Sequence, residues 1–234
     1  MKIPETLSYD DVLLVPQYSD IRSREECDTS TVIGPGVELK IPIISSCMDT
    51  VTEAEMAAAL ARMGGLGIIH RYNTPEDQAE LVRRAVVNAG GGPVAAAIGV
   101  TGDYFKRADL LLASGASALC IDVAHGHHIL VKEVLEELRA THGEGLCIIA
   151  GNVATKQGIN DLADWGANAV RCNIGGGSIC STRIQTGHGV PGLETILQCY
   201  QTDRNVAIIA DGGLRNSGDI VKAIAAGADC VMLG

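Results

Sequence analysis

The chain has 234 residues, enough for one large domain or two small ones with a substantial core. Apolar residues make up 47%, aromatic residues only 3%, and there are 28 glycines, which favours aliphatic strands joined by tight turns and excludes a disordered or fibrous chain. The net charge of -10 argues against a nucleic-acid partner. Because the sequence has neither a membrane-length apolar run nor a secretory signal, we expect a cytoplasmic protein with no membrane partner.

The eight cysteines contain no C-x-x-C pair, which argues against a disulfide framework. Four of them, Cys120, Cys147, Cys172 and Cys230, lie in or beside aliphatic runs, which is typical of reduced, buried thiols in a cytosolic protein. Cys180 differs because it lies in a glycine-rich turn.

Short aliphatic runs recur along the chain at intervals of about 27 residues, close to the length of one strand, one helix and two short loops. The runs are continuous rather than alternating, which predicts strands that are buried on both faces. The predicted strands are residues 41–46, 67–70, 94–100, 118–123, 146–150, 169–174, 206–210 and 230–233.

Helical patterns with recognisable ends fit between the predicted strands. Residues 52–55 (Thr-Glu-Ala-Glu) predict a capping box at the start of a helix that extends to Met63. Thr74 and Pro75 predict a cap and a first-turn proline for the next helix. The other predicted helices are residues 104–114, 129–139, 156–165, 193–201 and 219–226. Left-handed C-cap glycines are predicted at Gly115, Gly166 and Gly227.

Eight strands with helical crossovers predict a single (β/α)8 barrel over residues 1–234, with an open doubly wound sheet as the alternative. The last predicted strand ends where the sequence stops, at Gly234. We therefore expect a C-terminally incomplete barrel, and a native polypeptide that continues beyond Gly234 by at least a helix and a mobile segment.

Polar and glycine residues follow nearly every predicted strand, at the end of the barrel where such folds carry their function. Three glycine clusters, at residues 175–178, at Gly212 and Gly213, and at Gly234, can bring backbone N–H groups close to an anion. Tight turns use the same residues, but three clusters on one face favour a phosphate site.

Cys180 is a candidate nucleophile because it lies in a glycine loop beside Thr182 and the cationic Arg183, which is expected to lower the thiol pKa. A buried loop cysteine is the alternative that the residues alone leave open. The histidines at 125, 127 and 128 have no acidic partner at ligand spacing, so a polar loop is a better interpretation than a metal site.

At these residues the sequence resembles the IMP dehydrogenase/GMP reductase family along essentially its whole length. The matching segments are residues 9–16 (YDDVLLVP), 48–51 (MDTV), 67–71 (GIIHR), 122–126 (DVAHG), 150–155 (AGNVAT), 177–180 (GSIC), 182–183 (TR), 210–213 (ADGG) and 218–219 (GD). So many ordered matches are far more specific than any one glycine motif.

The resemblance implies that Cys180 attacks C2 of the purine of a nucleoside monophosphate, giving a covalent intermediate. In the dehydrogenase branch IMP loses hydride to NAD and water then releases XMP, whereas in the reductase branch GMP loses ammonia and NADPH delivers hydride to give IMP. Thr182 matches the family threonine that handles the water or ammonia.

The resemblance also implies a role for other positions of this sequence. The substrate nucleotide is assigned to Ser46, Met48, Ser178, Asp211, Gly212, Gly213 and Gly234, with Asp211 on the ribose hydroxyls and Met48 against the base. Asp122 and Asn152 fall on the nicotinamide side. A monovalent cation, K+, is assigned to the backbone oxygens of Gly175, Gly177 and Cys180. One departure is Asn173, which stands where the family pattern has glycine and bears on the affinity for this cation.

The two branches of the family are harder to separate. Dehydrogenases commonly carry a pair of CBS modules after the second strand, but the short span between His70 and Val94 holds no such insert, which favours the reductase, as do residues 23–28. Residues 52–54, 182–191 and 210–219 look closer to bacterial dehydrogenases, and we favour that branch. A non-catalytic nucleotide-binding barrel is the remaining alternative. The resemblance further implies a homotetramer.

Overall fold

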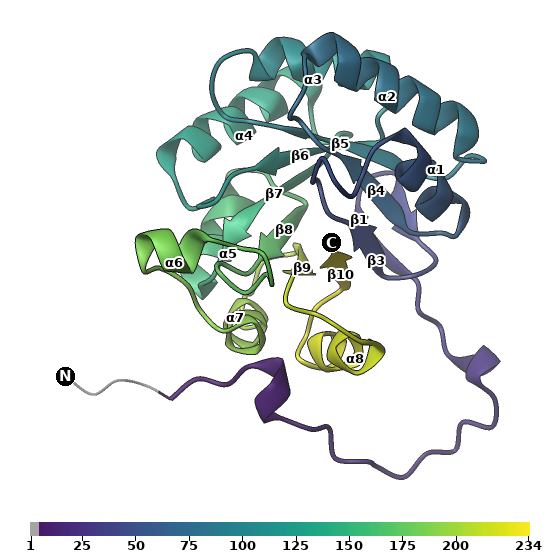
Figure 1. The fold of residues 1–234 in the computed structure, drawn as a ribbon, viewed down its shortest axis with the longest axis vertical. Coiled ribbons are helices and arrows are strands. Elements are labelled where there is room, and N and C mark those ends of the chain that lie inside the picture. The colour runs from purple at the N-terminus through teal and green to yellow at the C-terminus, as the bar shows by residue number, and fades with distance from the viewer. Residues whose placement is uncertain (1–4) are drawn as a thin grey trace.

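The computed structural model describes residues 5–234 and contains a closed barrel of eight parallel strands (Figure 1). Neighbouring strands pair in the order β10-β3-β4-β5-β6-β7-β8-β9, so the last strand closes on the first. The barrel strands are β3 (Ile43–Ser45), β4 (Leu66–Ile69), β5 (Val94–Ile98), β6 (Ala118–Asp122), β7 (Cys147–Val153), β8 (Ala169–Cys172), β9 (Ala207–Asp211) and β10 (Cys230–Leu233). This confirms the predicted (β/α)8 barrel and excludes the open sheet.

Helices follow the strands and cover the outside of the barrel, as Figure 1 shows. Their bounds are α1 (Ala54–Arg62), α2 (Pro75–Asn88), α3 (Tyr104–Ala113), α4 (Ile129–His142), α5 (Lys156–Asp164), α6 (Thr182–Thr186), α7 (Gly192–Cys199) and α8 (Ser217–Ala225). Each predicted helix is present with shifts of a few residues at its ends. The short helix α6 was not predicted.

The helix ends test the capping predictions. Thr74 caps α2 by accepting a hydrogen bond from the Asp77 N–H, and Pro75 is its first residue, as predicted. The capping box at residues 52–55 is wrong: Glu53 is the N-cap of α1 and makes no side-chain cap bond there. The Thr52 hydroxyl instead donates to Ser46 O at 2.6 Å, because it is buried beneath the preceding turn.

The three predicted C-cap glycines all have positive φ, a conformation that glycine adopts without a side-chain penalty. They lie one residue beyond the α-helical C-cap, between the helix and the strand that follows. The glycines therefore allow each helix to turn back into the barrel.

Two buried layers explain why the strand runs are continuous. In β6, Cys120 belongs to the cluster inside the barrel, whereas Leu119 and Ile121 belong to the cluster between strands and helices. Both faces of the strand are thus removed from water, and alternation of polar and apolar residues is absent along it. The four cysteines predicted to be buried are buried and free.

A two-stranded antiparallel hairpin that the sequence analysis missed closes one end of the barrel. Its strands are β1 (Thr31–Gly34) and β2 (Val37–Leu39), and its side chains Ile33, Val37 and Leu39 are buried with the interior cluster. A Cβ at Gly34 would lie against Cys147, the first residue of β7, so the hairpin covers the amino-terminal ends of the strands.

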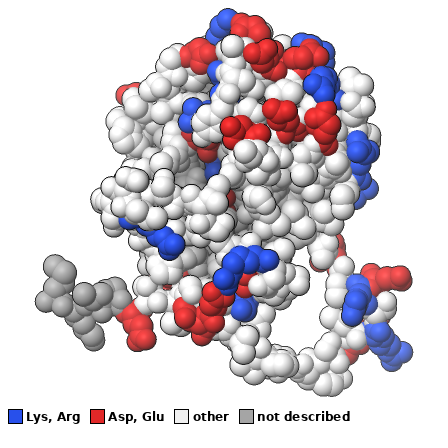
Figure 2. Space-filling model, viewed as in Figure 1, with Lys and Arg blue, Asp and Glu red and all other residues white. Residues whose placement is uncertain are grey.

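Before this hairpin, the chain follows an outer path around the barrel (Figure 1). It contains two short 3-10 turns, at Tyr9–Asp11 and Arg24–Glu26. None of the helices formed by residues 5–234 is long and apolar enough to cross a membrane. Figure 2 shows acidic and basic side chains interspersed on the viewed face, with no continuous basic patch on that face.

Candidate functional site

The carboxyl-terminal ends of β8 and β9 share one cavity of about 590 Å3. Its walls come from the segment after β8, the segment after β9 and the N-terminal residues 8–10. Those N-terminal residues are fixed to the barrel because Lys222 Nζ donates to Tyr9 O at 2.8 Å and Asp10 pairs with Arg215. The predicted glycine clusters after these two strands therefore face the same space.

The two glycine loops pack directly against each other. Gly212 and Gly213 both have positive φ, and a Cβ at Gly213 would come within 2.7 Å of Gly176 O. A Cβ at Gly212 would lie 3.4 Å from Gly177 Cα. At Gly213 only glycine permits this close approach of two backbones, whereas the Gly212 N–H already donates to Met232 O at 3.2 Å.

Cys180 lies at the end of the first glycine loop, half-buried and free, immediately before α6. Its N–H donates to Gly177 O at 3.1 Å, which closes a tight turn. Hydrogen bonding by the Thr182 side chain is the largest cause that lowers the pKa of the Cys180 thiol below its usual value, and a backbone hydrogen bond from Gly175 acts in the same direction. The charge of Arg183, which the sequence indicated as the cause, contributes less.

An arginine inside the barrel links two of the predicted site residues. Arg171 projects from β8 and is buried, with Nη1 donating to Asp122 Oδ1 at 2.6 Å and Nε donating to Asp211 Oδ2 at 3.0 Å. Burial is the largest influence and would raise the pKa of Asp122, but the charge and hydrogen bond of Arg171, with the charge of Arg71, together hold that pKa below its usual value. The sequence analysis missed Arg171, although a charge within an otherwise apolar strand is a signal for it.

Asn152 joins the same network from the end of β7. Its Nδ2 donates to Asp211 Oδ2 at 2.6 Å and to Asn173 O at 3.0 Å. Asp122 and Asn152 were assigned to the nicotinamide and Asp211 to the nucleotide ribose. The structure brings all three into one connected group around Arg171.

Three further predicted residues meet where β3 and β10 close the barrel. Ser46 N–H donates to Leu233 O at 2.9 Å, and Met48 Sδ lies 3.6 Å from the position of a Cβ at Gly234. The buried Thr52 hydroxyl fixes this turn through Ser46 O. Ser46, Met48 and Gly234 are therefore neighbours, whereas Ser178 is exposed on the other glycine loop.

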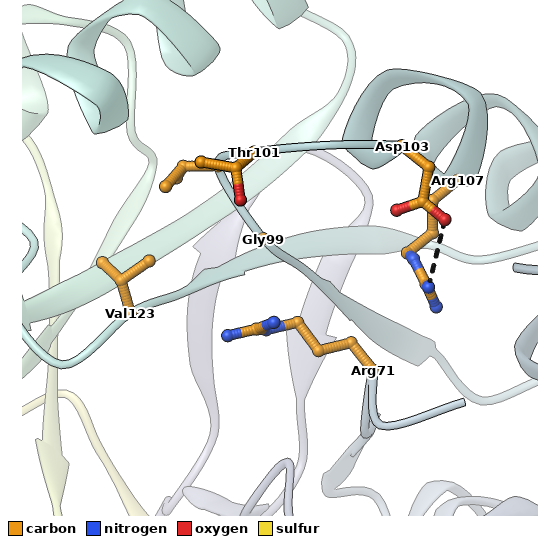
Figure 3. A pocket seen from close by; sticks show the side chains of 7 residues that line it. Arg71, Gly99, Thr101, Asp103, Arg107 and Val123 are labelled. Carbon is orange, nitrogen blue, oxygen red and sulfur yellow. Dashed lines mark hydrogen bonds and ion pairs between the residues drawn. The ribbon is translucent and has the colours of Figure 1, made fainter. Parts of the chain in front are cut away.

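A second, smaller cavity of about 240 Å3 is lined by Arg71, Gly99, Arg107 and Val123 (Figure 3). The Arg71 side chain extends below Gly99, and its Nη2 donates to Asp122 O at 3.0 Å. The Arg71 Nε is buried and has no hydrogen-bond partner among the described residues, although Asp122 Oδ2 lies 3.5 Å away. Arg107, on the far side, is already held by Asp103 and by Gln78. Arg71 thus lines the cavity while its guanidinium pairs with Asp122.

The segment around Cys180 offers neutral backbone oxygens and contains no acidic residue between positions 174 and 189. Such a donor set fits a monovalent cation better than a divalent one, which requires carboxylates. Within the described residues, no group of three or more His, Cys, Asp or Glu side chains could hold a metal ion. His127 instead pairs with Asp161, and His128 caps α4.

Comparison with known proteins places this geometry in a family. Residues 6–234 match the family model described as the IMP dehydrogenase / GMP reductase domain. Over the whole chain, the protein is 31% identical to an inosine-5'-monophosphate dehydrogenase of Nitrosopumilus maritimus, covering 75% of that protein.

Two other relatives match 99% of the chain. One is an inosine-5'-monophosphate dehydrogenase of Cryptosporidium parvum, 37% identical with 68% of that protein covered. The other is a GMP reductase of Leishmania donovani, 31% identical with 74% covered. With a family model that spans nearly every residue and relatives above 30% identity, the chain belongs to the IMP dehydrogenase / GMP reductase family.

Proposed function

We propose that the protein oxidises IMP to XMP with NAD through a covalent intermediate on Cys180. The observation that carries this proposal is the thiol itself, whose pKa is lowered on a glycine loop that packs against a second glycine loop. The thiolate is the reactive form of cysteine, so the lowered pKa favours nucleophilic attack near neutral pH.

The reaction balances in two steps. The Cys180 thiolate attacks C2 of IMP, and C2 then loses hydride to NAD+, which leaves the purine bound through a C2–S bond. Water next attacks C2, the C2–S bond breaks, and XMP and one proton are released as the thiolate re-forms. Thr182, two residues from Cys180 and the largest cause of the lowered pKa of its thiol, would hold the attacking water.

For the nucleotide, we propose a phosphate site on the backbone N–H group of Gly213 and the Ser178 hydroxyl, with Gly212 and Gly234 beside it. The Asp211 carboxylate accepts hydrogen bonds from the ribose hydroxyls. Arg171 and Asn152 hold this carboxylate in place because both donate hydrogen bonds to its Oδ2. Ser46 and Met48 contact the base from the opposite side. Holding phosphate and ribose places C2 at the thiolate, which converts the attack into an intramolecular step.

For the cofactor, we propose that Asp122 and Asn152 hold the nicotinamide riboside and that Arg71 faces the dinucleotide phosphates. The cationic Arg71 guanidinium, which lines the small cavity, fits an anionic group. When bound, the nicotinamide accepts the hydride that C2 releases.

Three further assignments complete the proposal. The carbonyls of Gly175, Gly177 and Cys180 hold K+, which stabilises the loop that carries the nucleophile. The barrel is one catalytic domain without a CBS insert, since α2 occupies the connection between β4 and β5. We also propose assembly into a homotetramer, and a monomer by light scattering at micromolar concentration would contradict it.

GMP reduction is the second candidate. In this reaction GMP, NADPH and two protons give IMP, NADP+ and ammonium. The same cysteine attacks C2 and displaces ammonia, and NADPH then delivers the hydride to C2. The short connection between β4 and β5 and the similarity to a GMP reductase favour this alternative.

A dinucleotide assay separates the candidates. With IMP and NAD+, the absorbance at 340 nm should rise as NADH forms, and XMP should be the other product. The rate of this rise should be higher in potassium than in sodium. Consumption of NADPH with GMP, and no oxidation of IMP, would transfer the assignment to the reductase. Tight IMP binding without either reaction would instead support a non-catalytic binding protein.

A further inference from the structure

Asn173 connects the two glycine loops at the ends of β8 and β9. Its side-chain Nδ2 donates to Asp211 O at 2.8 Å and to Gly212 O at 3.3 Å. Asn173 begins the loop that leads to Cys180, and Asp211 and Gly212 begin the loop with the predicted phosphate site. We refer to these two hydrogen bonds as the Asn173 link.

Glycines surround this amide and make room for it. A Cβ at Gly176 would overlap the Asn173 amide, with Oδ1 only 2.6 Å away, and a Cβ at Gly192 would lie 3.5 Å from Nδ2. A Cβ at Gly213 would lie 3.9 Å from the same nitrogen. The amide therefore fills the junction between the two loops and the start of α7.

The contacts fix the orientation of the amide. Both neighbours of Nδ2 are carbonyl oxygens, so turning the amide over would place Oδ1 against two acceptors. In the observed orientation Oδ1 is buried and has no donor among residues 5–234. Asn173 also has a φ of 156°, an unusual value for a residue other than glycine.

Those properties argue against a role in stability alone. A buried polar atom without a partner costs free energy, and an unusual φ adds strain. What the side chain gives in return is a fixed distance between the loop of the thiol and the loop of the predicted phosphate site.

We propose that Asn173 is a positioning residue, which holds the Cys180 loop in register with the phosphate loop through the Asn173 link. This inference rests on the proposed covalent chemistry at Cys180. A misplacement of about 1 Å between a nucleophile and a bound substrate costs roughly a hundredfold in rate. Loss of the link therefore affects the rate of attack more than the binding of nucleotide.

The variant of choice is Asn173→Gly, because glycine tolerates the observed φ and is the residue of the family pattern at this position, so the variant is expected to fold. The proposal therefore requires that this chain depends on the Asn173 link where the family pattern does without it. Asn173→Asp keeps the size of the side chain but replaces the donor with an oxygen that faces two carbonyls. Asn168→Ala is the matched control. Asn168 precedes the opposite end of β8 and also makes side-chain hydrogen bonds, with Arg139 and with Ile148 N–H.

Two measurements are needed. The first follows iodoacetamide alkylation of the peptide that contains Cys180 across a pH series, which requires no turnover. The second separates kcat from KM for IMP. In Asn173→Gly we expect the alkylation midpoint to move to higher pH, because the loop hydrogen bonds to the thiol loosen, and kcat to fall about 10- to 100-fold with KM changed less than about threefold.

Asn173→Asp should lose at least as much kcat, and Asn168→Ala should retain the wild-type midpoint and kcat even if its melting temperature falls. The proposal is wrong if folded Asn173→Gly keeps both wild-type values, or if Asn168→Ala loses kcat equally. If wild-type protein turns over neither IMP nor GMP while the midpoint still moves in Asn173→Gly, the link stands and the proposed function fails.

Discussion

The two ends of the barrel are built on opposite principles. At the amino-terminal end, the hairpin β1–β2 inserts Ile33, Val37 and Leu39, all essentially inaccessible to water, against the apolar interior. At the carboxyl-terminal end, the interior contains the Arg171 network and the unpartnered Asn173 Oδ1. Apolar closure stabilises one end, whereas the other keeps polar groups at a cost because their positions are needed.

Replacement of the nucleophile should have the largest effect on the polar end. Cys180→Ala is expected to abolish turnover while the affinity for IMP stays within about tenfold, because the phosphate site lies on other residues. Steady-state assays and isothermal titration measure the two quantities. Cys27→Ala, at an exposed cysteine, is the control and should behave as wild type. Unchanged turnover in Cys180→Ala would contradict the proposed role of Cys180 as the nucleophile.

Truncation within the hairpin should affect the apolar end alone. Ile33→Ala is expected to lower the free energy of unfolding by about 2–4 kcal/mol, since Ile33 is fully buried. The affinity for IMP should not change. Val32, its neighbour on β1, is 64% exposed, so Val32→Ala should cost less than about 0.5 kcal/mol. Urea unfolding of the three proteins checks this, and equal losses in both variants would contradict the closure role of the hairpin.

Sequence alone predicted the barrel well because buried parallel strands leave continuous aliphatic runs, such as residues 118–123. It missed the hairpin β1–β2 because its strands are too short, at Thr31–Gly34 and Val37–Leu39, to leave a pattern. The capping box at residues 52–55 failed because a tertiary contact, from Thr52 to Ser46, replaced a local one.

The candidate site could be proposed from sequence where its residues end or follow a strand, because Asp211 is the last residue of β9 and Cys180 lies in the loop after β8. Arg171 lies within a strand, and its role depends on Asp122 and Asp211 from two other strands. Only the closed barrel brings those carboxylates to one guanidinium. A local pattern carries no information about such a distant pairing.

Replacement of Arg71, at the proposed cofactor site, should have a moderate effect on the KM for NAD+. Arg71→Gln should raise the KM for NAD+ about tenfold, because one charge-assisted contact is worth roughly 1.4 kcal/mol, and should leave the KM for IMP unchanged. Initial rates at varied concentrations of each substrate test this. Arg83→Gln, on the exposed face of α2, is the control. An equal rise in the KM for IMP would show that the small cavity does not belong to the cofactor.

The smallest expected effect concerns the acidity of the thiol. The pKa of Cys180 is lowered mainly by the Thr182 side chain, so Thr182→Val should raise that pKa toward its ordinary value. The thiolate fraction at neutral pH then falls, and the pH midpoint of Cys180 alkylation moves upward. Arg183→Gln should move the midpoint less, because its charge contributes less. A larger shift in Arg183→Gln than in Thr182→Val would show that the charge of Arg183, and not the Thr182 side chain, is the main cause of the lowered pKa.

The pairing of β10 with β3 has a consequence for the order of folding. These strands come from nearly opposite ends of the chain, so their contact closes a loop of almost the full sequence, and such contacts form slowly. Ser46 and Met48 reach Gly234 only after this event. The loops after β8 and β9 need only a local pairing of neighbouring strands. In a refolding experiment, protection of the buried Cys172 thiol, whose residue pairs with Ala210 of β9, should therefore precede the appearance of a complete nucleotide site.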